Sequence, residues 1–201
     1  MQDLTGRLLV ASPREGAGAG LVVEVDVDDE IGSGSNVFDR SVVLVLHHDD
    51  DGSHGLVLNH PLNAEVDSVL PGWQEHVNAP PRVFQGGPVS LDTALGLVRM
   101  PGTTESVGIK RLFGAVGLVD FDAPPVVVVP EVAGIRIFAG YAGWSGGQLE
   151  AEIDDGSWFV VDAEADDAFT VDPADLWGTV LRRQRGALRF MSSYPSDPSL
   201  N

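Results

Sequence analysis

The chain of 201 residues contains no cysteine, and this absence excludes disulfides, cysteine-ligated zinc, iron–sulfur clusters and thiol catalysis. Positive charge is also scarce. Twelve Lys and Arg stand against thirty Asp and Glu, so the formal net charge is 12 − 30 = −18. Because the acidic residues are spread along the chain, the negative field should repel phosphate groups over the whole surface. Binding to nucleic acid is therefore disfavoured.

Long apolar runs are missing as well. No segment approaches the roughly 18 apolar residues that a membrane-spanning helix needs. The first seven residues, MQDLTGR, lack the basic and apolar regions of a signal peptide. We therefore expect a cytoplasmic protein that makes no membrane contact. Hydrophobic residues make up 43% of the chain, and a chain of this length can bury an ordinary core.

The apolar pattern predicts a single α+β domain over residues 1–201, because no linker divides the chain. Residues 41–46 and 55–59 are apolar runs flanking a polar loop at 49–53, which indicates a β-hairpin. Helices are predicted at 64–70, after Ser145, and from Asp172 to Arg185. Further strands are predicted at residues 8–10, 23–27, 82–84, 94–100, 112–120, 126–129, 135–141 and 158–162.

Ser145 is the first candidate for chemistry. It lies in the sequence GWSGG (143–147), which matches the G-x-S-x-G nucleophile elbow between a strand and a helix. All five histidines precede Ser145, which excludes the chain order of an α/β-hydrolase but leaves other orders open. Ser145 followed three residues later by Gln148 also fits a helix capping box. A hydrolase that uses Ser145 is therefore an alternative hypothesis.

A second candidate is a metal site. His47, His48, Asp49, Asp51 and His54 offer nitrogen and oxygen donors within eight residues. A native site would need three or four of them to converge. The alternative is a solvated turn flanked by surface histidines. We expect no cofactor, and a hydrolase using this cluster stays a minor hypothesis.

The only basic cluster consists of Arg182, Arg183, Arg185 and Arg189. It could contact DNA, an anion or an acidic partner. It could equally complement the negative end of the last helix, with the acidic segment at 162–175 neutralising it. We favour the structural interpretation, so a DNA-binding transcriptional regulator is the less favoured alternative.

Several segments together resemble the YqgE/AlgH family of bacterial proteins. The matching positions are GRLLVAS (6–12), FDRSVV (38–43), His48, GLVLNHPL (55–62), GGPV (86–89), GYAGWSGGQLE (140–150) and Trp158. The resemblance implies a large, strongly curved and largely antiparallel sheet with a few flanking helices. Family members are often labelled transcriptional regulators, and no established enzymatic mechanism comes with the family. Residues 14–36 are expected to be an insertion relative to it.

We expect a non-enzymatic binding or regulatory protein that acts through a protein or small-molecule partner. The binding site is expected among the polar and glycine-rich motif positions. The alternative is that these residues serve turns, caps and buried hydrogen bonds. The candidates are Arg40, Ser41, His48, Asn59, Gly86, Gly87, Tyr141, Trp144 and Gln148.

Overall fold

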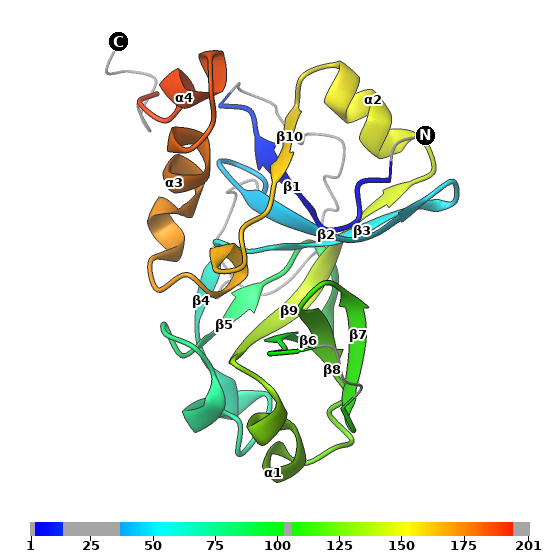
Figure 1. Ribbon diagram of the computed structural model, residues 1–201, viewed down its shortest axis with the longest axis vertical. Helices are drawn as coiled ribbons and strands as arrows, with labels where there is room; N and C mark the ends of the chain where they lie inside the picture. The colour runs from blue at the N-terminus through cyan, green and yellow to red at the C-terminus, as the bar shows by residue number, and fades with distance from the viewer. Residues whose placement is uncertain (1–2, 14–36, 103–105, 195–201) are drawn as a thin grey trace.

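The computed structural model describes residues 3–13, 37–102 and 106–194. The predicted strand at 23–27 and the predicted insertion at 14–36 lie outside these residues. In the described part of the chain, ten strands form one sheet, in the order β10-β1-β2-β3-β9-β6-β8-β7, with β5 pairing with β9 and β4 with β5 (Figure 1). The strands are β1 (Arg7–Ala11), β2 (Val42–Asp49), β3 (Gly52–Val57), β4 (Pro61–Glu65), β5 (Arg82–Gln85), β6 (Val89–Arg99), β7 (Ile109–Phe113), β8 (Val116–Val119), β9 (Gly134–Ser145) and β10 (Trp158–Asp162).

Over residues 3–13, 37–102 and 106–194, four α-helices and several single turns of 3-10 helix accompany the sheet. The α-helices are α1 (Pro125–Val128), α2 (Gln148–Asp154), α3 (Leu176–Arg182) and α4 (Ala187–Met191). The 3-10 turns are Val66–Ser68, Gln74–His76, Val129–Glu131, Asp167–Phe169 and Pro173–Asp175. Within the described residues, no helix is long and apolar enough to span a bilayer.

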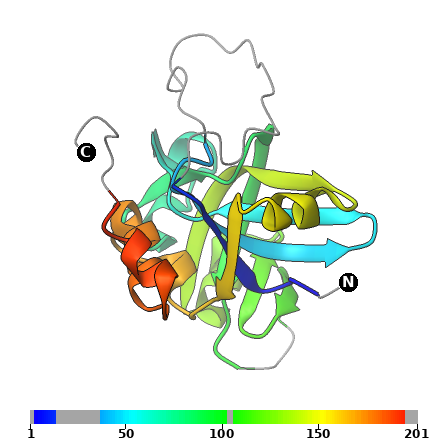
Figure 2. The ribbon, with the colours of Figure 1, turned by 90° about the horizontal axis from the view of Figure 1, so that it is seen from above.

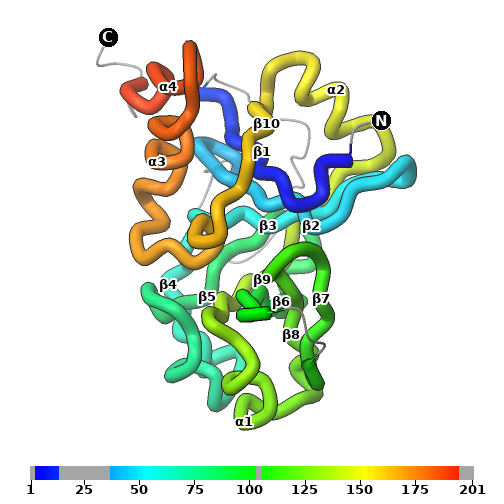
Figure 3. Tube along the Cα trace, viewed as in Figure 1, coloured from blue at the N-terminus to red at the C-terminus, as the bar shows by residue number. Residues whose placement is uncertain are grey.

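The long strand β9 joins the two halves of the sheet. Residues 142–145 of β9 pair with β3 in the upper half of Figure 1, and residues 134–141 pair with β6 in the lower half. The pairing of β5 with β9 is parallel, whereas the other strand pairs are antiparallel. The tube view in Figure 3 shows the sheet curling between the two halves. The expected curved, largely antiparallel sheet is confirmed, and the arrangement is compatible with a single α+β domain.

Apolar side chains fill both faces of this sheet. One cluster lies between the sheet and α3, where Trp177 donates its indole N–H to the carbonyl of Ala11 over 2.9 Å. A second cluster packs Leu149 of α2 against the upper strands, and a third lies in the lower half around Val128. Seen from above, α3 and α4 lie on the side opposite the β2–β3 hairpin tip (Figure 2). Burial of these faces is the main stabilising contribution.

The sequence pattern gave the wrong element in three places. Residues 126–129, predicted as a strand, lie in α1 and the 3-10 turn after it. Prolines 124, 125 and 130 flank this valine run, and proline lacks the N–H that a strand ladder requires, whereas the first turn of a helix tolerates it. The predicted helix at 64–70 is instead the end of β4 and a 3-10 turn. The predicted strand at 112–120 is divided by a turn at Gly114, whose φ is +49°.

Arg136 ties β9 to the loop before β5 and to the end of the 3-10 turn Asp167–Phe169. Its Nη2 donates to the carbonyls of Ala79 and Thr170 over 2.8 and 2.7 Å, and its guanidinium lies 4.3 Å from the Phe84 ring centroid. Only 1% of the residue is exposed, and burial lowers the pKa of its guanidinium to about 10. The carbonyl contacts compensate part of the cost of burying this charge.

Candidate functional site

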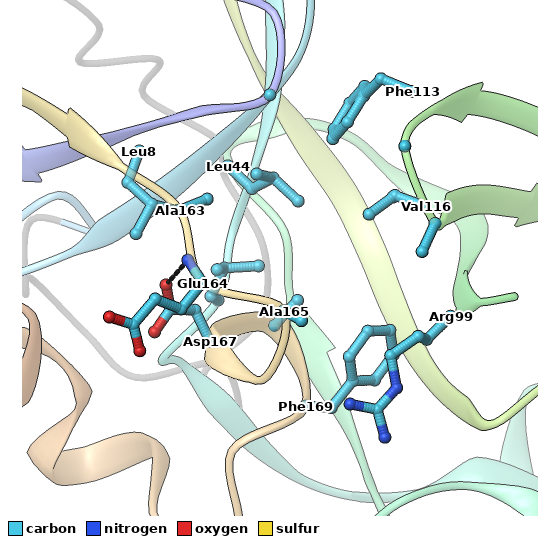
Figure 4. Close-up of a pocket in the computed structure, with 15 residues that line it drawn as sticks. Leu8, Leu44, Arg99, Phe113, Val116, Ala163, Glu164, Ala165, Asp167 and Phe169 are labelled. Carbon is cyan, nitrogen blue, oxygen red and sulfur yellow. Dashed lines mark hydrogen bonds between the residues drawn. The ribbon is translucent and has the colours of Figure 1, made fainter. Parts of the chain in front are cut away.

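A pocket of about 200 Å³ lies where the two halves of the sheet meet; we call it the central pocket. Strands β1 and β2 form one wall and the β7–β8 hairpin forms another. The segment 163–169, which follows β10, closes a third side (Figure 4). The residues around it are Gly6, Leu8, Leu44, Leu58, Arg99, Phe113, Gly114, Ala115, Val116, Ala163, Glu164, Ala165, Asp167, Ala168 and Phe169.

The interior of the central pocket is apolar and its charged groups lie at the ends. Figure 4 shows Arg99 beside Phe169 at the end away from Leu8. The guanidinium carbon of Arg99 lies 5.7 Å from the Phe169 ring centroid, and Arg99 forms an ion pair with Asp166. The Asp166 side chain is 85% exposed, whereas that of Arg99 is 30% exposed. The positive group is therefore the more enclosed member of this pair.

At the opposite end, the acidic groups are tied to α3. Arg183 donates to both carboxylate oxygens of Asp167 over 2.6 Å, and it lies 3.4 Å from Glu164 Oε2. These hydrogen bonds to Asp167 raise the pKa of Arg183, while burial partly opposes the rise. Asp167 also accepts from the Glu164 N–H, which closes the turn. Arg183 thus fixes the segment that covers the central pocket.

The favoured interpretation of the basic cluster is supported by these contacts. Arg183 pairs with Asp167, and Arg182 pairs with Asp175 within its own helical region. The hydrogen bond from Arg182 lowers the pKa of Asp175. Asp172 accepts from the Asp175 N–H over 3.4 Å, as expected of a cap residue. Two of the four arginines are therefore neutralised by the acidic segment before them.

Three of the motif candidates come together at the start of β2. The Asn59 side chain accepts from the Val42 N–H over 2.9 Å and donates to the Arg40 carbonyl over 3.0 Å. Arg40 has a positive φ of 48°, lies 4.8 Å from the Trp177 ring, and donates to the Tyr194 carbonyl over 3.1 Å. Ser41 is fully buried beside it. Both polar atoms of the Asn59 side chain therefore form hydrogen bonds with backbone groups.

Three other candidates lie in or next to α2. The indole of Trp144 donates to Glu152 Oε2 over 2.9 Å, and Gln148 Nε2 donates to Glu152 Oε1 over 3.0 Å. On the same side of the sheet, the buried His48 shares a hydrogen bond of 2.7 Å with Ser53 Oγ. Its Nε2 lies 3.5 Å from Glu150 Oε1. These side chains hold α2 against β2, β3 and β9.

Gly86 and Gly87 lie where the chain crosses the backbone of β9. A Cβ on Gly86 would come within 2.3 Å of the Gly140 carbonyl oxygen, and one on Gly87 within 2.2 Å of the Tyr141 carbonyl carbon. The motif therefore requires glycine for close backbone approach. The Tyr141 ring lies beside that of His54, with ring centroids 5.4 Å apart.

Ser145 ends strand β9 and is exposed. It does not cap α2, because the N-cap is Gly147, with a φ of +77°. Instead, the Ser145 N–H and hydroxyl both donate to Gln148 Oε1 over 3.1 Å. Among the described residues, Ser145 makes no hydrogen bond with a histidine. Of the two reciprocal hydrogen bonds of the predicted capping box, the structure therefore contains the one in which the Gln148 side chain accepts from the Ser145 N–H.

The metal candidates are divided between the two faces of the hairpin. Leu46 forms a bulge in β2, and the consecutive residues His47 and His48 point to opposite faces. His47 pairs with Asp49 over 2.7 Å and lies beside His54, with ring centroids 6.4 Å apart. Asp51 is in the exposed turn. In the described part of the chain, no group of three or more His, Asp or Glu side chains is placed to hold a metal ion.

Sequence reasoning missed the central pocket and Glu152. Arg99, Phe113 and Phe169 come from three distant segments, and no local pattern links them. Glu152 lies four residues after Gln148 in α2, one helical turn further along the same face. That spacing could have indicated a shared network with Gln148.

Comparison with known proteins places the chain in a family. An AlgH-like family model matches residues 29–189. UPF0301 proteins from Streptomyces coelicolor and Thermobifida fusca are 46% and 42% identical. The first alignment covers 100% of this chain and 97% of the relative, and the second covers 99% and 96%. A similar protein from Mycobacterium tuberculosis is 39% identical, covering 100% and 98%.

Solved structures agree on the fold. A crystal structure of a Corynebacterium diphtheriae protein matches with a TM-score of 0.78 and 29% identity, covering 96% of this chain and 94% of that one. The solution structure of AlgH from Pseudomonas aeruginosa matches with a TM-score of 0.64 and 21% identity, covering 98% and 96%. The family model and the full-length relatives show that the chain belongs to the AlgH-like family.

Proposed function

We propose that this protein is a non-catalytic binding protein and that its ligand is a small molecule held in the central pocket. The observation that carries the proposal is the pocket itself, an apolar space of about 200 Å³ between elements from both halves of the sheet. An apolar cavity of about 150 Å³ suffices to bind benzene. A ligand of one or two rings, or a short chain, therefore fits the volume.

The contacts of the motif residues support a role without catalysis. Hydrogen bonds within the protein occupy polar side-chain atoms of Asn59, Trp144 and Gln148. Serine catalysis requires a base within hydrogen-bond reach of the hydroxyl, and the Ser145 hydroxyl donates to an amide oxygen instead. The regulatory role and the cytoplasmic location stay predictions.

Titration with uncharged probes tests the proposal. We expect benzene, indole or 1-hexanol to shift the NMR resonances of Leu8, Leu44 and Val116 and to raise the melting temperature. Val116→Phe, which fills the pocket, should abolish the shifts. The matched control is Val126→Phe, since Val126 is 78% exposed on α1. Absence of binding by all three probes, or equal binding by both variants, would contradict the proposal.

A further inference from the structure

We infer that the ligand of the central pocket is a small amphiphilic monocarboxylate, whose apolar body fills the pocket and whose carboxylate pairs with Arg99. This inference rests on the proposed function, because it specifies the chemistry of the same site. Among the described residues that line the pocket, Arg99 is the one with a positively charged side chain. It stacks on Phe169, so a ligand that reaches it stays in contact with apolar surface.

The present partner of Arg99 is easily replaced. Asp166 is 85% exposed, so its carboxylate returns to water when another carboxylate takes its place. Exposed ion pairs contribute little to stability. A ligand carboxylate that is partly enclosed beside Phe169 would form the stronger, charge-assisted hydrogen bonds with the planar guanidinium.

The acidic groups at the other end set the orientation. Glu164 and Asp167 also border the pocket, but both lie within 4 Å of Arg183, the C-cap residue of α3. Figure 4 shows their carboxylates turned away from the apolar side chains of Leu44 and Val116. An anionic head therefore lies at the Arg99 end, with the apolar body directed toward Leu8 and Phe113.

The net charge of −18 repels any anion. The distance over which this repulsion acts decides how much it weakens anion binding. At physiological ionic strength the Debye length is about 8 Å, so distant exposed carboxylates are largely screened. The contact with Arg99 acts at hydrogen-bond distance and is screened less. The local pair therefore determines which ligand is preferred.

Binding of matched acid and amide pairs tests the inference. We expect benzoate and hexanoate to bind about tenfold or more tightly than benzamide and hexanamide, the usual gain for a hydrogen bond to a charged group. Arg99→Gln should weaken the binding of the carboxylates and thereby remove this preference. Arg182→Gln removes the same charge outside the pocket and should keep the preference.

A second variant tests the inference if Arg99→Gln fails to fold. Asp166→Asn removes the competing carboxylate, so carboxylate probes should bind up to about fivefold more tightly. Asp175→Asn is its control and should change nothing. Equal affinities within each pair, or a preference that survives Arg99→Gln, would overturn the inference while amide binding still supports the pocket. If neither member of a pair binds, the inference is also overturned, and the uncharged probes decide the proposed function.

Discussion

Trp144 and Trp158 donate their indole N–H groups to the same carboxylate oxygen, Glu152 Oε2, over 2.9 and 2.7 Å. The two rings lie 6.0 Å apart in an edge-to-face arrangement, and both residues are buried. One helical residue thus satisfies the polar atoms of two core aromatics from β9 and β10. Since α2 carries Glu152, the contact joins the helix to two strands that are separated in the sheet.

Glu152→Ala should destabilise the protein by about 2–6 kcal/mol, because it leaves two buried donors without an acceptor and each costs about 1–3 kcal/mol. Urea unfolding followed by tryptophan fluorescence measures the change. Glu75→Ala, at an exposed position, should change the stability by less than about 0.5 kcal/mol. Equal stabilities of the two variants would contradict a shared acceptor role for Glu152.

Asn59→Ala should cost about 1–3 kcal/mol, since it leaves the Val42 N–H and the Arg40 carbonyl unpaired at the start of β2. The free energy of unfolding in urea gives the comparison. Asn63→Ala is the matched control, because Asn63 is exposed and its side-chain oxygen accepts from the exposed Arg82. A loss of ligand binding by Asn59→Ala at unchanged stability would instead favour a binding role for Asn59.

The stability should fall as the pH drops from 7 toward 5, in part through His60. Burial lowers the pKa of His60, and the backbone hydrogen bond with Asp39 offsets this only partly. The unfolded imidazole takes up a proton near pH 6.5 while the folded one stays neutral, so acid favours the unfolded state. The destabilisation from His60 is absent above the pKa of the imidazole in the unfolded chain. It cannot exceed about 1.4 kcal/mol per pH unit.

His60→Asn should flatten the dependence of unfolding free energy on pH between 7 and 5 relative to the unmodified protein. His76→Asn serves as the control, because His76 is exposed. Chemical unfolding at half-unit pH steps provides the curves. Parallel curves for the unmodified protein and His60→Asn would exclude His60 as the source.

Gly87→Ala should destabilise the protein by more than about 3 kcal/mol or prevent its folding, because the new Cβ would overlap the Tyr141 and Ala142 backbone. Gly147→Ala is the control. Gly147 also has a positive φ, yet nothing lies within 4 Å of its Cβ position, so only a backbone cost of about 1 kcal/mol is expected. Soluble yield and urea unfolding separate the two, and similar costs would contradict the close crossing.

Local chemistry predicted the elements whose signals are local. The strand at 158–162 was predicted, and β10 has those bounds. The hairpin of β2 and β3 was also predicted, although its turn is tighter than the loop expected at 49–53. The valine run after Pro125 was wrongly predicted as a strand. Valine has a high strand propensity, but the flanking prolines lack the N–H groups that a strand ladder needs.

The candidate site depends much less on local signals. The sequence identified Asn59, Trp144 and Gln148 as special positions, but their partners are set by contacts between separate elements. The central pocket was not foreseen, since Leu8, Arg99, Phe113 and Phe169 are brought together only when the sheet curls.

By itself, the sequence determined the α+β class, the strongly acidic surface, the absence of cysteine chemistry and the family motifs. Those properties follow from composition, local periodicity and short-range hydrogen bonding. Only the tertiary structure decided that Arg183 neutralises Asp167, that Glu152 serves two indoles and that an apolar pocket ends at Arg99. The physical reason is that β9 pairs with strands from both halves of the sheet, so residues distant in the chain become neighbours that no local pattern encodes.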